Sequence, residues 1–184
     1  MMNQLIFTRD EEQAGRGPRG LAHRCSAGEL TRLRQGVYVP TEIWSALPPG
    51  NSTRLRIEAA VGKGRTPCVL TQESAAAVWG IPISGNTSEV QLLATNGAHG
   101  KRRAHLRWHA RTLPEPVQDI DGLLVTGRIQ TVVDMAARLR FEQAVPGMDH
   151  ILRSDGKRRL PALDKDQLRA VAGQLPPMHN AGGP

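Results

Sequence analysis

The stretch "LTRLRQGVYVP" (Leu30–Pro40) has the pattern of a tight β-hairpin. Two short runs of strand-forming residues flank Gln35 and Gly36, and the glycine supplies the positive φ that a tight turn needs. The first run carries Arg32 and Arg34, and a two-residue spacing on a regular strand places both side chains on one face. The hairpin is therefore predicted to present arginines on its exposed face.

The residues before the hairpin predict two short helices. Thr8, with Glu11 three residues later, matches a capping box and places the first helix over residues 9–14. A glycine-rich segment then ends this helix. Pro18 suits the first turn of a second helix, which is expected to close at Gly28.

The second helix is predicted to have a buried face and a basic face. At 100° per residue, Leu21 and Cys25 share one side. The basic and polar residues lie on the opposite side, on its flank or just before the helix: Arg16, Arg19, His23, Arg24 and Ser26. The order helix, helix, hairpin resembles a winged helix-turn-helix, in which the second helix enters the major groove of DNA. We assign residues 1–48 to this DNA-binding unit.

Charge and composition favour an anionic partner. The 184 residues include 24 Lys and Arg against 17 Asp and Glu, a net charge of +7. Arginine suits phosphate and guanine because its guanidinium group binds both in a bidentate way. Aromatic residues make up only 3%, which argues against a base-stacking platform for single strands. Two further groups of residues complete the candidate DNA contacts: Gln35 at the hairpin turn, and Lys101, Arg102 and Arg103 in an expected loop.

The remainder of the chain predicts an α+β domain over residues 49–155, followed by a basic C-terminal helix and tail over 156–184. Asp121 and Gly122 between two alternating runs indicate a hairpin with a type I′ turn. Pro146 and Gly147 are expected to interrupt the last amphipathic helix of this domain. The other expected elements are helices near 52–64, 71–80, 129–140 and 141–154, and strands near 68–70, 89–95 and 104–110.

Motifs for enzyme chemistry are weak. No Gly-Lys pair has the glycine spacing or the Ser/Thr of a P-loop, and no G-x-G-x-x-G opens a βαβ unit. His105 and His109 fall on an expected strand, where four residues span about 13 Å, too far for one zinc ion. We therefore predict no enzyme activity, no cofactor and no metal site. No stretch has the character of a signal peptide or a membrane span, so a cytoplasmic protein without a membrane partner is expected.

Several segments, in order and spacing, resemble the AbiEi-type antitoxin family of bacterial transcriptional regulators. They are "ELTRLRQGVYVP", "VLTQESAAAVWGIP", "EVQLLAT", "DIDGLLVT", "QTVVDMAARLRFEQAV" and "MDHILR". The resemblance covers about residues 3–153. It implies an N-terminal winged helix-turn-helix followed by an α+β antitoxin-like domain. It also implies binding to, and repression of, the protein's own promoter in a type IV toxin–antitoxin system, with a nucleotidyltransferase-like toxin as partner.

Two alternatives to the repressor reading remain open. One is a protein-interaction antitoxin module that does not bind DNA. The other is a truncated DNA-processing protein, because many relatives in this family continue into a Vsr-like nuclease domain. The chain lacks an acidic cluster followed by a Glu-x-Lys pattern late in the sequence, so no nuclease activity is expected of these residues.

Overall fold

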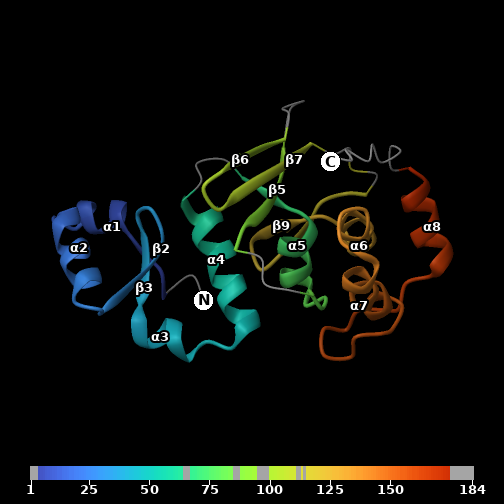
Figure 1. The fold of residues 1–184 in the computed structure, drawn as a ribbon, viewed down its shortest axis with the longest axis horizontal. Helices are drawn as coiled ribbons and strands as arrows, with labels where there is room; N and C mark the ends of the chain where they lie inside the picture. Colours follow the sequence, from blue (N-terminus) through green and yellow to red (C-terminus); the bar gives the residue numbers. More distant parts are fainter. Residues whose placement is uncertain are drawn as a thin grey trace, which may run out of the picture.

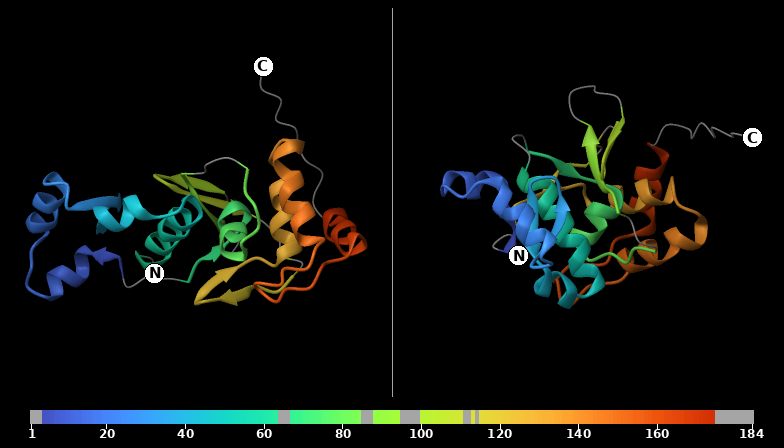
Figure 2. Two further views of the ribbon diagram at one scale, coloured as in Figure 1. Left: turned by 90° about the horizontal axis from the view of Figure 1, so that it is seen from below. Right: turned by 60° about the vertical axis from the view of Figure 1, so that its left-hand side comes forward.

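The structure, a computed structural model, describes residues 4–63, 67–84, 88–94, 100–110, 113 and 115–174. Over these residues the fold is a mixed α+β arrangement with a three-stranded and a six-stranded sheet (Figure 1), which confirms the expected class. The molecule is elongated, with the N-terminal helices at one end and the last helix, α8, at the other (Figure 2). Within the described ranges, no helix has the length and apolar character needed to cross a membrane.

The N-terminal unit begins with a short strand and two helices: β1 (Ile6–Phe7), α1 (Thr8–Gln13) and α2 (Pro18–Ser26). The hairpin follows as β2 (Leu30–Arg34) and β3 (Val37–Pro40), with Gly36 at a φ of +76° in the turn. Strand β3 lies between β1 and β2, and both pairings are antiparallel. The bounds of α2 and the position of the turn confirm the sequence prediction. The predicted capping box is wrong, because the cap residue of α1 is Phe7 and no side chain caps this helix.

Helix α4 (Pro49–Lys63) lies between the two sheets and packs against both (Figure 1). It follows the short helix α3 (Thr41–Ala46). Leu55 and Ala59 pack into the core of the N-terminal sheet, whereas Ile57 and Ala60 belong to the core of the larger sheet. The N-terminal sheet therefore completes its hydrophobic core with a helix that starts after the predicted boundary at residue 48.

The larger sheet has the strand order β6-β7-β5-β4-β9-β8. Its strands are β4 (Val69–Leu70), β5 (Val90–Ala94), β6 (Lys101–Arg103), β7 (Leu106–Ala110), β8 (Gln118–Ile120) and β9 (Leu123–Val125). Strand β4 pairs antiparallel with β5 and parallel with β9. The loop predicted for residues 101–103 is wrong, because they form the edge strand β6, which pairs antiparallel with β7. These three basic residues do not favour a strand by themselves, and it is the pairing with β7 that makes them one.

Helix α5 (Gln72–Trp79) packs on this sheet, and α6 (Arg128–Ala136) packs on α5. Helices α7 (Phe141–Ile151) and α8 (Lys165–Gly173) pack in turn against α6. Helix α5 ends at Gly80, whose φ of +75° is the left-handed conformation of a helix terminus. The predicted interruption at Pro146 and Gly147 is wrong, since α7 continues through both. Packing explains this, because Gly147 is buried, and a β-carbon there would lie 3.4 Å from Ile81.

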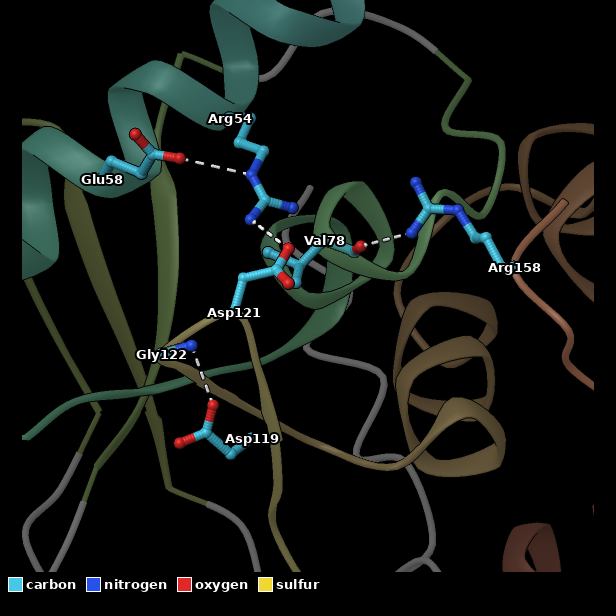
Figure 3. Close-up of polar contacts among 7 residues, drawn as sticks. All are labelled: Arg54, Glu58, Val78, Asp119, Asp121, Gly122 and Arg158. Carbon is cyan, nitrogen blue, oxygen red and sulfur yellow. Dashed lines mark hydrogen bonds and ion pairs between the residues drawn. The ribbon is translucent and has the colours of Figure 1, made fainter. Parts of the chain in front are cut away.

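Polar contacts tie the early helices to later segments of the chain (Figure 3). Arg54 of α4 pairs with Glu58 one turn along and with Asp121 in the β8–β9 turn, at 3.2 and 2.9 Å. That turn has the positive φ angles of a type I′ hairpin at Asp121 and Gly122, +53° and +78°, as predicted. Arg158 donates a hydrogen bond of 2.8 Å to the carbonyl oxygen of Val78 and so covers the C-terminal end of α5.

A partly buried polar network lies at the start of α5. Glu73, 3% exposed, pairs with Arg138 just beyond α6. Arg138 also donates to Oε1 of Gln72 at 3.0 Å. His109 of β7 contacts Gln72 at 3.4 Å and Gln91 of β5 at 2.6 Å. The network therefore connects α5, the sheet and the end of α6.

Candidate nucleic-acid interface

The exposed face of α2 carries the polar residues expected there. Leu21 is 2% exposed and faces inward, whereas Arg19, His23 and Ser26 are exposed. Figure 1 shows α2 at the end of the molecule farthest from the larger sheet. Its outer face is therefore open to a large partner.

The N-terminal end of α2 is unusually positive. Its cap residue is Gly17, which offers no side chain, Pro18 starts the helix, and no acidic residue lies in the first turn. Arg16 and Arg19 lie there instead, at the end where the helix dipole already favours negative charge. A β-carbon at Gly17 or Gly20 would meet nothing within 4 Å, so the backbone at this end is open. A phosphate group here would be stabilised by the helix end and by Arg16.

Two arginines near α2 already have carboxylate partners. Arg16 forms two hydrogen bonds of 2.8 Å with Glu11 of α1, which lower the pKa of Glu11. Arg24 pairs with Glu29 at 3.1 Å. No ion pair involves Arg19 or His23 within the described part of the chain. Arg19 and His23 are therefore basic α2 side chains that a ligand can reach without an ion pair being broken first.

Ser26 has a different role from the one expected. Its hydroxyl donates to the carbonyl oxygen of Ala22 one turn earlier, at 3.1 Å. The Ser26 hydroxyl hydrogen is thus engaged within α2, so towards an outside partner the oxygen can only accept a hydrogen bond.

The two hairpin arginines differ in their environment. Arg32 is exposed, as expected. Arg34 is half-buried and donates to the carbonyl oxygen of Ala60 in α4 at 3.1 Å, so the expectation that it is exposed is wrong. The strand register shifts between these residues, which breaks the simple two-residue alternation. Burial lowers the pKa of the Arg34 guanidinium.

Arg34 acts together with Arg9 at the end of α4. Arg9 donates to the carbonyl oxygen of Gly62 at 2.9 Å. The last carbonyl groups of a helix lack partners within the helix and carry partial negative charge. Both arginines thus cap α4 and fasten the N-terminal unit to it.

Arg34→Ala is therefore expected to lower the free energy of unfolding by about 1–2 kcal/mol, because it removes a charged hydrogen bond to a helix end. Arg32→Ala, an equal charge change two residues away, should alter it by less than about 0.5 kcal/mol. Urea denaturation of both variants compares the two values. Equal stability of the two variants would contradict the capping role of Arg34.

Strand β6 holds the remaining predicted residues, and all three are exposed. Lys101 lies over the ring of Trp108, 4.8 Å from its centroid. Arg102 pairs with Glu89. Arg103 instead lines a groove that it shares with Arg32 on the hairpin.

The predicted residues thus fall on three surfaces. Those around α2 form the first, and Lys101 and Arg102 lie on the second, beside Arg107 and His109. The third is the groove, which combines Arg32, Arg34, Gln35 and Arg103 with two residues that sequence reasoning missed, Arg56 and His105. No local pattern indicates these two, because the groove is formed by segments far apart in the chain.

Comparison of the chain with protein-family models and with curated proteins finds no match.

Proposed function

We propose that this protein is a DNA-binding transcriptional regulator whose N-terminal unit is a winged helix-turn-helix. The observation that carries the proposal is the exposed face of α2, where Arg19 and His23 have no ion pair within the described residues. In this reading α1 supports α2, α2 enters the major groove, and the β2–β3 hairpin is the wing. The open, positive end of α2 suits a phosphate group of the same duplex.

The roles of the side chains follow from their surroundings. Arg19 and His23 face base edges, because they project from the outer face of α2. Arg16, Arg24 and Arg32 contact phosphates, which position the protein but carry no sequence information. Arg34 contributes mainly by fixing the hairpin to α4.

We further propose that the protein represses its own promoter as an antitoxin of the AbiEi type, with a nucleotidyltransferase-like toxin as partner. The resemblance of residues 3–153 to that family supports this reading. The test is binding to the DNA upstream of its own gene against scrambled DNA, at about 50 and 200 mM salt, since neutralised phosphates make affinity fall steeply with salt. Equal, salt-independent binding to both DNAs would contradict the proposal. Magnesium-dependent cleavage of the DNA would instead favour a DNA-processing protein.

Arg19→Ala is expected to weaken binding to the cognate site by about 1–3 kcal/mol and to leave binding to random DNA nearly unchanged. Arg32→Ala should weaken binding to both DNAs alike and reduce the salt slope by about one unit. Fluorescence anisotropy with both duplexes measures these effects. Arg153→Ala is the control, because Arg153 is exposed and lies two residues after α7, a helix on the far side of the larger sheet from α2 (Figure 1). If Arg19→Ala binds both duplexes as the Arg153→Ala control does, α2 does not read sequence.

A further inference from the structure

A groove of about 1020 Å³ lies between the N-terminal hairpin, α4 and the β5–β7 part of the larger sheet. Figure 1 shows these elements side by side along the molecule. One wall carries Arg32 and Arg34 from β2. The opposite wall carries Arg103 and His105 from the β6–β7 hairpin, and Arg56 comes from α4 between them.

The groove has positive charge without matching negative charge. No Asp or Glu belongs to its described lining, although four arginines do. Arg34 is half-buried, and its hydrogen-bond partner is a carbonyl oxygen rather than a carboxylate. Guanidinium groups that line one concave surface repel one another, so an anion in the groove would lower the energy.

The same groove has an apolar part. Trp44 and Trp108 line it together with Val90, Leu92 and Leu106. Both tryptophans are half-buried. The guanidinium of Arg56 lies over the ring of Trp44, 5.2 Å from its centroid, and this contact holds both side chains in place. A flat aromatic group entering beside the arginines would thus find a firm apolar surface.

We propose that this groove binds a nucleotide, with its phosphates on the arginines of the two walls and its base against the tryptophan-lined surface. The volume is at the upper end of the range for small-molecule sites, about 300–1,000 Å³. Guanidinium groups bind phosphate through paired, charge-assisted hydrogen bonds. The site goes beyond the proposed reading of DNA by α2 and uses different side chains, apart from Arg32.

Isothermal titration of the whole protein with ATP, in the absence of DNA, tests the proposal. Adenosine and tripolyphosphate, titrated in parallel, represent the two halves of the probe. ATP is expected to bind at least about tenfold more tightly than either half, since each half forfeits either the charged hydrogen bonds or the apolar contact. No heat with ATP, or tripolyphosphate binding as tightly as ATP, would overturn the nucleotide assignment.

Variants on opposite walls locate the site. Arg32→Gln and Arg103→Gln should each weaken ATP binding about tenfold, because each removes a charged hydrogen bond. Arg107→Gln is the matched control, since Arg107 is exposed on β7 and lines the other concave surface, beside Lys101 and Arg102. An equal loss in all three variants would mean that ATP binds through general charge, and would overturn the proposal.

Two competitors separate the nucleotide from other anions. The competitors are random duplex DNA and polyglutamate. If one of them displaces ATP, and if its own affinity falls in both Arg32→Gln and Arg103→Gln, the groove is assigned to that polymer instead of a nucleotide. Arg19→Ala should bind ATP as the parent does, whatever it does to DNA binding. A loss of sequence-specific DNA binding and a loss of ATP binding are therefore observed separately.

Discussion

Arg138→Met is expected to lower the free energy of unfolding by about 2–3 kcal/mol, because it leaves the buried carboxylate of Glu73 without its charged partner. Glu73, the partner, is 3% exposed, and its Oε2 atom has no hydrogen-bond partner within the described structure. Arg138 also holds Gln72, a buried residue at a φ of +49°. Methionine keeps much of the apolar stem but leaves the Glu73 carboxylate buried and unpaired.

The double variant Arg138→Met with Glu73→Gln should recover a large part of this loss, because a neutral amide costs much less to bury than a carboxylate. Arg140→Met, two residues away, provides the control: Arg140 pairs with Glu142 on the surface, and such pairs contribute less than about 1 kcal/mol. Urea denaturation at neutral pH gives all the values. A loss in Arg138→Met no larger than in Arg140→Met would show that the Glu73–Arg138 pair adds little to stability.

Leu55→Ala is expected to lower the free energy of unfolding by about 2–5 kcal/mol, since Leu55 is fully buried in the N-terminal core. Its helix, α4, also supplies Ile57 and Ala60 to the core of the larger sheet. Loosening α4 should therefore weaken both cores together. We expect one cooperative unfolding transition at a lower urea concentration than in the parent protein. Tryptophan fluorescence and circular dichroism should report the same transition.

Leu168→Ala is the comparison, because Leu168 is only half-buried and belongs to α8, the helix at the opposite end of the molecule from α2 (Figure 2). Leu168→Ala should lower the free energy of unfolding by about 1 kcal/mol. If Leu55→Ala instead unfolds in two separate steps, with only the first displaced, the N-terminal unit unfolds independently and α4 does not couple the two cores.

Local rules predicted the parts of the fold that a few neighbouring residues determine. Gly36 and Asp121-Gly122 require positive φ angles, so both hairpin turns could be placed from sequence. Pro18 and Gly28 fixed the limits of α2 in the same way, and helical spacing gave its exposed face. The candidate contacts on α2 therefore followed from sequence alone.

Features that depend on distant contacts could not be predicted. Lys101–Arg103 forms a strand because β7 pairs with it, while the residues themselves suit a loop. Pro146 remains inside α7 because Ala144, Gly147 and Ile151 are buried and hold the helix on both sides of it. The contact of Arg34 with Ala60 likewise arises only when the hairpin meets α4.

The central position of β4 has a consequence for synthesis on the ribosome. Leu70 pairs with Leu92 of β5 on one side, but on the other side Val69 and Leu70 pair with Leu124 and Val125, more than fifty residues later. Chains emerge at roughly 5–20 residues per second, and N-terminal parts fold first. The nascent chain should therefore pass through a stage in which the apolar edge of β4 is unpaired. During those seconds a chaperone that binds apolar strands would protect this edge, and pausing of translation before β9 would lengthen the exposure.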